Sequence, residues 1–285
     1  MLRIKSFLIA SITLVAFLIP ASAEQMSLSG TLKDVNSGSS YNVTISPVTI
    51  PVPPPVVEPT PIPAPDPVAE PVASSTIPLT YTAPQFSGNS VASSTTVASG
   101  GTIKNKTITD TGQTASIVTR GSATIDNVRI KSREGVRVGG GGTVTIQNSY
   151  VEVNGAGDDH ADGLQAYSPG SKGVITVRNS TFKTGTTAVN AGFFIADNWT
   201  GTIDFDNVVV WGGPYGLKIH PDVGGDNIIK FKNVFVVGPF TWGGLWVDER
   251  TIGGHKNIIQ QWENVREATI VDGKLVPGNL IPKPF

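Results

Sequence analysis

Cysteine is absent from the 285-residue chain, so no disulfide stabilises the fold and no cysteine can carry a lipid anchor. Stability must therefore come from burial and hydrogen bonding. An excess of charge of one sign is also lacking, because 21 basic residues are balanced by 22 acidic ones. No stretch of the chain forms a stripe of Lys and Arg, which argues against a nucleic-acid partner.

The apolar run near the N-terminus is too short to cross a membrane comfortably. It covers residues 7–19, whereas a transmembrane helix needs about 20 residues. Arg3 and Lys5 precede this run and Ala21-Ser22-Ala23 follows it, which is the pattern of a cleaved secretory signal. We therefore predict a signal peptide over residues 1–23, export to the periplasm, the medium or the cell surface, and no stable membrane insertion of the mature protein.

Helix-forming patterns are almost missing as well. Residues 47–84 are rich in proline, which fixes φ and removes a backbone donor, so this segment favours extended polyproline II. We assign residues 24–84 to an N-terminal tail and Pro-rich linker, and residues 85–285 to one folded domain. In that domain Val, Ile, Thr, Asn and Gly dominate, a composition that is typical of β structure.

A short motif centred on asparagine recurs along the domain. An apolar residue stands two positions before each Asn, and in every copy but the last another stands three positions after it. The repeated residues are Asn105, Asn127, Asn148, Asn179, Asn207, Asn233 and Asn264, at intervals of 22, 21, 31, 28, 26 and 31. Such periods predict an all-β solenoid, a single-stranded parallel β-helix of about seven coils. At a corner of each coil, an Asn amide tolerates left-handed geometry and can bond to the Asn of the next coil.

This pattern, over roughly residues 100–267, resembles the right-handed parallel β-helix of the pectate-lyase-like superfamily. The resemblance is architectural. It implies a right-handed coil and an extracellular or periplasmic scaffold, and members of that superfamily often act on acidic polysaccharides.

A second repeated strand begins at a glycine in five successive coils, at Gly135, Gly163, Gly192, Gly216 and Gly244. Since strand side chains alternate, the residue two positions after each glycine is expected to face solvent. This gives an outward ladder of Arg137, Gln165, Phe194, Lys218 and Trp246. A second outward ladder is Gly139, Tyr167, Ala196, His220 and Asp248, and a third, directly before the glycines, is Glu134, Asp162, Ala191, Tyr215 and Gly243.

The outward ladders predict a shallow groove for a polysaccharide with acidic sugars, with Tyr167 and His220 as its walls and Ala196 as its floor. A polysaccharide lyase needs a cation beside the uronate carboxylate and a base near the proton that it removes. We predict that Lys218 and His220 are these catalytic residues. The predicted substrate-binding residues are Arg137, His160, Asp162, Gln165, Tyr167, Phe194, Trp246 and Asp248.

The segment DDHADGLQAY, residues 158–167, adds several carboxylates next to this groove. Oxygen ligands suit Ca²⁺, so Ca²⁺ is the candidate metal and no other cofactor is implied. Its predicted ligands are Asp158, Asp159 and Asp162, with Glu152 as a further oxygen donor. The same residues also fit a plain polar loop, in which His160 caps the loop and Asp162 bonds to the backbone.

Three functions remain open from the sequence. The first is a polysaccharide lyase, and the second is a non-catalytic adhesin or surface-structural protein that the Pro-rich linker presents. The third is hydrolysis, since HADGLQ (160–165) loosely resembles the NTDG coil of polygalacturonases, although Ala191 stands where a glycosidase needs a carboxylate. In each case we expect a monomer.

The C-terminal segment carries a hairpin pattern. Asp272-Gly273 lies between apolar and β-branched runs, which predicts a tight turn between two strands. An open β-helix end exposes unpaired strands. We therefore expect this hairpin to cover the last coil.

Overall fold

The computed structural model of this protein describes residues 28–33, 40–45, 77–110, 112, 114–166, 171–185 and 188–285. The chain divides into two compact units, Met1–Val68 and Ala69–Phe285. In the first unit β1 (Leu28–Lys33) pairs antiparallel with β2 (Ser40–Ile45), within the segment assigned to the tail. The predicted signal peptide and residues 46–76 of the predicted linker lie outside the described residues. In the part of the chain that is described, no helix has the length and apolar character needed to cross a membrane.

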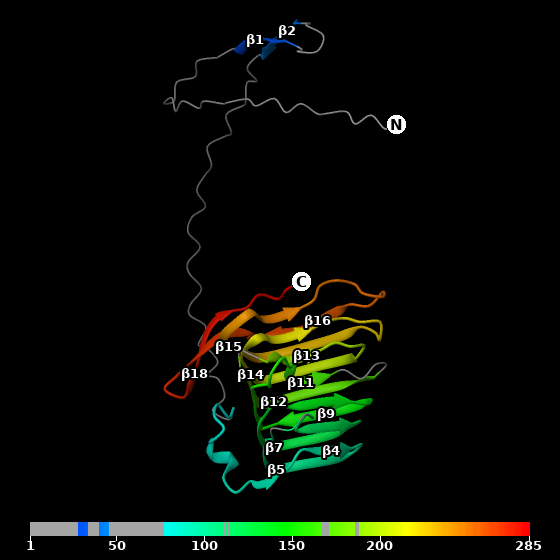
Figure 1. The fold of residues 1–285 in the computed structure, drawn as a ribbon, viewed down its shortest axis with the longest axis vertical. Coiled ribbons are helices and arrows are strands. Elements are labelled where there is room, and N and C mark those ends of the chain that lie inside the picture. Colours follow the sequence, from blue (N-terminus) through cyan, green and yellow to red (C-terminus); the bar gives the residue numbers. More distant parts are fainter. Residues whose placement is uncertain are drawn as a thin grey trace, which may run out of the picture. The chain divides into compact units, whose positions relative to one another are not determined.

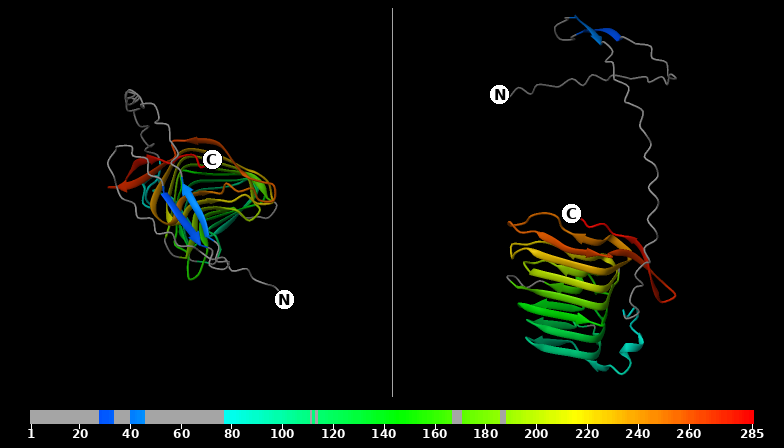
Figure 2. Two further views of the ribbon diagram at one scale, coloured as in Figure 1. Left: turned by 90° about the horizontal axis from the view of Figure 1, so that it is seen from above. Right: turned by 180° about the vertical axis from the view of Figure 1, so that it is seen from behind.

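The second unit is a parallel β-helix in which each coil contributes strand segments to three faces (Figures 1 and 2). Its elements are the 3-10 helix η1 (Pro84–Phe86) and the strands β3 (Ser90–Ala92), β4 (Thr95–Ala98), β5 (Gly101–Asp110), β6 (Ile117–Arg120), β7 (Ala123–Ser132), β8 (Val136–Gly139), β9 (Gly142–Gln147), β10 (Tyr150–Val153), β11 (Ala161–Ala166), β12 (Lys172–Thr184), β13 (Val189–Ile195), β14 (Thr200–Ile219), β15 (Asn227–Val247), β16 (Asn257–Glu263), β17 (Arg266–Val271) and β18 (Lys274–Leu280).

Each face is a ladder of parallel strands from successive coils. The first face holds the segments before the asparagines, from β5 through β7, β9, β12, β14 and β15 to β16. The second face holds the segments after them, from β3 to β17. The third face joins β4, β6, β8, β11, β13 and the last parts of β14 and β15. These pairings confirm the prediction of an all-β parallel β-helix.

The asparagine motif marks the corner between the first and second faces, as predicted. All seven residues have positive φ, between 46° and 63°. At four steps of the column, the side-chain nitrogen of one Asn donates to the side-chain oxygen of the Asn one coil earlier, at 2.7 to 3.4 Å. At the other two steps the donors Asn148 and Asn233 bond instead to carboxylates, those of Asp126 and Asp206. The column ties neighbouring coils together where the chain bends.

Inward-facing side chains of all three faces form one continuous core. Aliphatic residues fill the early coils, and rings stack along the axis in the later ones. The stacked residues are Phe182, Phe193, Phe205, Phe231 and Trp262, with successive ring centroids 4.2, 4.6, 4.9 and 5.4 Å apart. Tilted and offset rings at these separations attract one another beyond the gain from burial. This core replaces the disulfides that the chain lacks.

The glycines that begin the third-face strands are required by close approach of the backbone. A Cβ atom on Gly163 would lie 2.5 Å from the carbonyl oxygen of Gly192, and one on Gly192 would lie 2.5 Å from that of Gly216. Both separations are too short for carbon and oxygen atoms, so a side chain would push the coils apart. The alignment of these glycines in the sequence therefore has a steric cause.

Among the described residues, the segment just before the predicted domain start at Gln85 also packs on the β-helix. Residues 77–86, here called the strap, run along the outside of the second face. Ile77 packs with Val237 in a late coil, while Phe86 is fully buried against Tyr150 in an earlier one. Proline prevents this segment from forming a core of its own, but Ile77, Ala83 and Phe86 are buried on the face of the β-helix.

The predicted C-terminal hairpin is present, but it does not itself cover the last coil. β17 and β18 pair antiparallel around Asp272-Gly273, and the hairpin projects to the side of the β-helix (Figure 2). Ile281, directly after β18, supplies the cover: its nitrogen donates to the Val265 carbonyl, and its carbonyl accepts from Trp262 Nε1, both at 2.8 Å. Glu267 occupies the inward position that Val236 holds one coil earlier, so the apolar column ends here.

Candidate functional site on the third face

The predicted outward ladder exists on the third face. Gln165 is in register with Arg137 and Phe194, and Lys218 is in register with Phe194 and Trp246. These five side chains are partly exposed, whereas the inward residues beside them are buried, except for the half-buried Leu245 in the last of these coils. Alternation along the strands therefore placed this ladder correctly.

Lys218 lies among aromatic rings. Its Nζ is 4.7 Å from the ring centroid of Trp246 and 5.3 Å from those of Phe194 and Tyr215. Trp242, whose side chain is 64% exposed, extends this cluster, with its centroid 5.1 Å from that of Tyr215. Among the described residues, no carboxylate forms an ion pair with Lys218. The ammonium is held by ring faces and remains available to an anion.

His220 lies directly after β14, two positions after Lys218, and is held by two residues of the next coil. Its Nε2 is 3.2 Å from Asp248 Oδ2 and 3.3 Å from Arg250 Nη2. Arg250 also donates to both carboxylate oxygens of Asp248, and these bonds are the main reason why the pKa of Asp248 is lowered. The predicted substrate ligand Asp248 is only 3% exposed, and it anchors His220 and Arg250 instead. Within the described residues, His220 Nδ1 has no hydrogen-bond partner.

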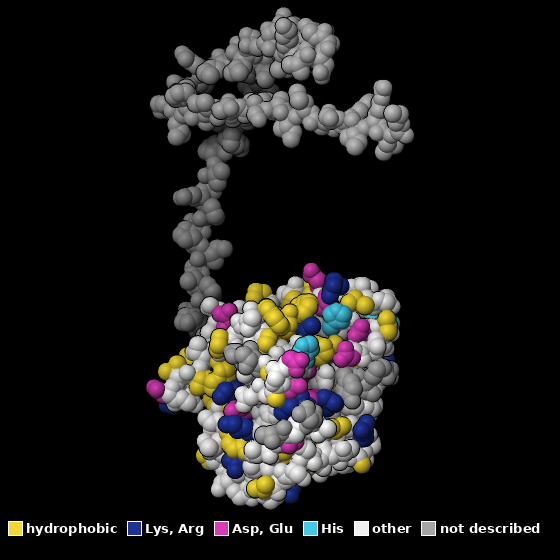
Figure 3. All heavy atoms as spheres, viewed as in Figure 1, with side chains coloured by type: hydrophobic (Ala, Val, Ile, Leu, Met, Phe, Trp, Pro, Cys, Tyr) yellow, Lys and Arg dark blue, Asp and Glu magenta, His cyan; other side chains and the backbone are white. Residues whose placement is uncertain are grey.

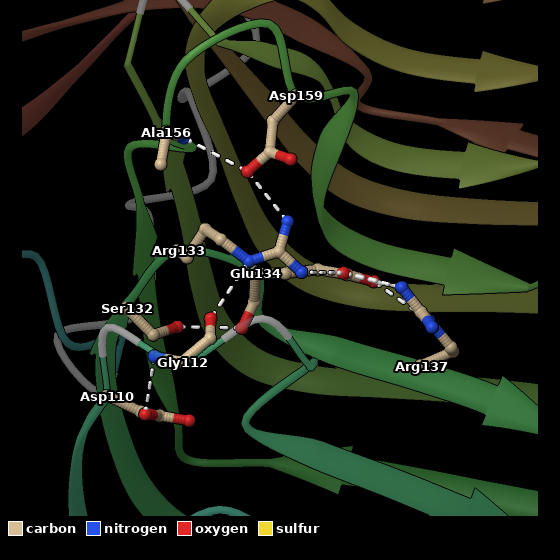
Figure 4. A network of polar contacts seen from close by, with 8 residues as sticks. All are labelled: Asp110, Gly112, Ser132, Arg133, Glu134, Arg137, Ala156 and Asp159. Carbon is tan, nitrogen blue, oxygen red and sulfur yellow. Dashed lines mark hydrogen bonds and ion pairs between the residues drawn. The ribbon is translucent and has the colours of Figure 1, made fainter.

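Arg137 is occupied by a buried carboxylate, which the sequence did not predict. Its Nε and Nη2 donate to Glu134 Oε1 at 2.9 and 2.7 Å. Glu134, 3% exposed, also pairs with Arg133, which reaches Asp159 Oδ2 at 2.6 Å and lowers the pKa of Asp159 (Figure 4). This network ties the loop before β11 to the start of the third face. It satisfies the charge of Arg137 within the protein, so we do not assign Arg137 to the substrate.

Asp162 is buried, which corrects its place in an outward ladder. It lies two residues before the inward Leu164 and therefore points to the same side, and its side chain is 1% exposed. Its Oδ1 accepts a hydrogen bond of 2.9 Å from the nitrogen of Ala191, while Oδ2 has no hydrogen-bond partner among the described residues. Burial, reinforced by the nearby charge of Glu134, raises the pKa of Asp162 well above its ordinary value. Asp162 is therefore a structural residue of the core edge.

The predicted calcium ligands are not brought together. In the described part of the chain, no group of three or more His, Asp and Glu side chains could hold a metal ion. Asp159 is bound to Arg133, Asp162 is buried, and Asp158 lies on an exposed turn. Glu152 lies on the second face and pairs with lysines there. The proposed function therefore includes no Ca²⁺ ion.

The predicted groove is only partly described. Tyr167, one of its walls, lies outside the described residues. Ala196 is 5% exposed, which suits a floor, and His160 is exposed on the turn before β11. Figure 3 shows histidine, acidic and hydrophobic side chains gathered in the coils nearest the C-terminus.

Arg250 belongs to the site but was not predicted. The sequence feature that could have identified it is Asp248 two residues earlier, because an Asp favours a turn of this kind. In the structure the backbone nitrogen of Arg250 donates to Asp248 Oδ1 at 3.0 Å. Tyr215 was placed in the third ladder, but its contact with Lys218 could not be foreseen because it depends on the rotamers of both side chains.

Comparison with known proteins agrees with this architecture. A family model described as "Right handed beta helix region" matches residues 82–233, more than half of the chain. No curated protein and no solved structure matches the chain. The matched range includes six of the seven corner asparagines, and the fold is compatible with the pectate-lyase-like superfamily. The chain belongs to the family of right-handed β-helix proteins.

Proposed function

We propose that this protein is exported and binds an acidic polysaccharide on its third face. The signal-like N-terminus supports export, and the family match supports the broad class of carbohydrate-active or surface proteins. The observation that carries the proposal is Lys218, an ammonium in contact with three rings and without an acidic partner among the described residues. Aromatic faces stack on sugar rings, and a cation offsets the charge of a uronate carboxylate.

The spacing of the ladder suits a chain of sugars. Phe194 and Trp246 lie two coils apart on the same face, about 10 Å, with Lys218 in the coil between them. A polysaccharide that runs along the β-helix axis could place sugar rings over Phe194 and Trp246 and a carboxylate over Lys218. The exposed Trp242 would lengthen this surface at the end nearest the C-terminus.

The second face provides an internal comparison. There Lys183 lies over the ring of Trp211, with Nζ 4.8 Å from its centroid, in a contact like that of Lys218 and Trp246. Lys183, however, also pairs with Glu152 at 3.6 Å. A carboxylate of the protein already offsets its charge, so this pair offers less to an acidic ligand.

Affinity electrophoresis tests the proposal. The protein would be run through native gels that contain polygalacturonate, alginate or, as an uncharged control, dextran. We expect the two uronate polymers to retard the wild-type protein and dextran not to do so. Trp246→Ala should lose most of the retardation, whereas Trp211→Ala should keep it. Equal retardation of the wild type and Trp246→Ala would contradict the proposal.

A second candidate, a polysaccharide lyase, is favoured by the contacts of His220. If Nε2 donates its proton to Asp248, then Nδ1 carries no proton and can accept one from the carbon next to a uronate carboxylate. Lys218 would offset the charge of that carboxylate. His220→Ala should then lower the release of unsaturated product at least about a hundredfold. Binding without any unsaturated product from the wild type would leave the protein as a binding protein.

A further inference from the structure

His220 lies where a change of its charge acts directly on the proposed polysaccharide site. It lies directly after the end of β14, two positions after Lys218 and about 7 Å further along the extended chain. A histidine side chain is of the type that changes its charge between pH 5 and 8, whereas the exposed carboxylate of a uronate sugar stays ionised over that range. We propose, resting on the proposed function, that His220 is a charge switch that strengthens the binding of acidic polysaccharide as the pH falls from 8 to 5.

In the neutral tautomer with its proton on Nδ1, which is not the tautomer that the lyase candidate requires, Nε2 of His220 can accept a hydrogen bond from Arg250 Nη2, 3.3 Å away. Arg250 meanwhile donates to Asp248 from Nη2 at 2.6 Å and from Nε at 2.9 Å. The charges of Arg250 and Asp248 then offset each other. Lys218 supplies the remaining positive charge of the site.

In the charged state of His220, Nε2 carries a proton and can only donate. Its acceptor is then Asp248 Oδ2, 3.2 Å away, the oxygen that Arg250 Nη2 also uses. Asp248 is 3% exposed and cannot turn away, whereas the side chain of Arg250 is 62% exposed and can swing outward. The site therefore gains one charge at His220 and brings a second cation toward the solvent side, where the ligand lies.

Among the described residues that surround His220, no other side chain is of the type that titrates between pH 5 and 8. On its own coil, the charged neighbours of His220 along the chain are Lys218 and Asp222, and Asp222 accepts a hydrogen bond from the nitrogen of Asn198. The charged residues at this level of the adjoining coils are Asp197, Asp248, Glu249 and Arg250. Acidification over this range therefore changes the charge of this group through His220.

The expected effect is moderate because the site is partly open to water. A charge on His220 about 7 Å from the carboxylate bound at Lys218 should, in such a setting, change the affinity by roughly five- to tenfold. The direction is fixed by sign: a positive charge added beside Lys218 strengthens the binding of an anion.

His255 supplies a matched control. Its Nδ1 is 3.6 Å from Asp226 Oδ1 on the neighbouring turn, so it also forms a His–Asp pair between successive coils. It does not belong to the ladder that holds Lys218. His255→Gln should therefore leave the binding site unchanged.

Calorimetry of the full chain with oligogalacturonate, at constant ionic strength from pH 5 to pH 8, tests the switch. We expect the wild-type dissociation constant to be about five- to tenfold lower at pH 5 than at pH 8. His220→Gln should abolish this dependence, and His255→Gln should preserve it. Wild-type binding that does not vary with pH, or a His220→Gln variant that keeps the dependence, would overturn the switch while leaving the proposed function in place.

A ligand-free measurement separates the two ideas further. Nuclear magnetic resonance of the histidine rings should show His220 gaining its charge between pH 8 and pH 5, with the Arg250 Nε resonance moving at the same midpoint. A His220 that keeps one charge state over this range would overturn the switch without any polysaccharide. If His220 titrates but no uronate polymer binds at any pH, the proposed function is wrong, and the proposed switch is wrong as well because it rests on that function.

Discussion

Asn207 Nδ2 donates a hydrogen bond of 2.7 Å to Asn179 Oδ1, 28 residues earlier in the chain. Both residues have positive φ, 63° and 46°, so each one bends its own coil and joins it to its neighbour. The corner must stay in register from coil to coil, whereas loops elsewhere can vary in length. This is why the motif recurs at uneven intervals.

Replacing Asn179 with Ala should lower the free energy of unfolding by about 1 to 3 kcal/mol, because alanine is strained at positive φ and the hydrogen bonds of the column are lost. Asn179→Gly should lose less, since glycine adopts positive φ without strain. Urea denaturation measures both variants. If both unfold at the wild-type midpoint, the asparagine column does not stabilise the fold.

Gly192→Ala should lower the free energy of unfolding by roughly 2 kcal/mol or more, because its Cβ would meet the Gly216 carbonyl oxygen at 2.5 Å. Gly238→Ala is the matched control, since the nearest atom to its Cβ would be 3.9 Å away. Thermal unfolding followed by circular dichroism compares them. Equal losses for the two variants would mean that close approach of the coils is not the cause.

Asp162→Asn should stabilise the protein near neutral pH. The pKa of Asp162 is raised in the folded state, mainly by burial, so the unfolded chain loses this proton first as the pH rises. The free energy of unfolding of the wild type should therefore fall from about pH 4 upward, and that of the variant should fall less over the same range. Urea denaturation across this range measures the effect, with the exposed Asp158→Asn as control. A variant that is less stable than the wild type at pH 7 would contradict the assignment.

The strap should be necessary for the full stability of the β-helix. Phe86→Ala should cost about 3 to 5 kcal/mol, because the ring is fully buried, whereas Val91→Ala should cost little at an 83% exposed site. Removal of residues 24–80 would take away the buried Ile77 and should lower the thermal midpoint. An unchanged midpoint would show that the packing of Ile77 contributes little.

The repeated corner and the third-face strand could be predicted because each leaves a residue-specific signal once per coil. Asn recurs where φ is positive, and Gly recurs where a neighbouring carbonyl leaves no room for Cβ. Alternation from Leu164 and Leu217 then gave the outward ladder. The same backbone geometry recurs in every coil and selects the same residue type each time, so it leaves a repeat in the sequence.

The partners of the site residues could not be predicted in the same way. Arg137 is bound to Glu134, and Asp248 is bound to Arg250, through side-chain contacts that occur in one coil only. The motifs that recur once per coil do not identify such pairs. The burial of Asp162 could have been predicted, because it shares the parity of Leu164 along the strand.

The most direct test of the central claim compares two lysines that both lie over a tryptophan ring. Lys218 has no acidic partner among the described residues, while Lys183 pairs with Glu152. Calorimetry with oligogalacturonate at low and high salt would be carried out on the wild type, Lys218→Gln and Lys183→Gln. We predict that Lys218→Gln weakens binding about tenfold and reduces its salt dependence, and that Lys183→Gln binds as the wild type does. Wild-type affinity in Lys218→Gln, or equal losses in both variants, would contradict the assignment of the third face as the polysaccharide site.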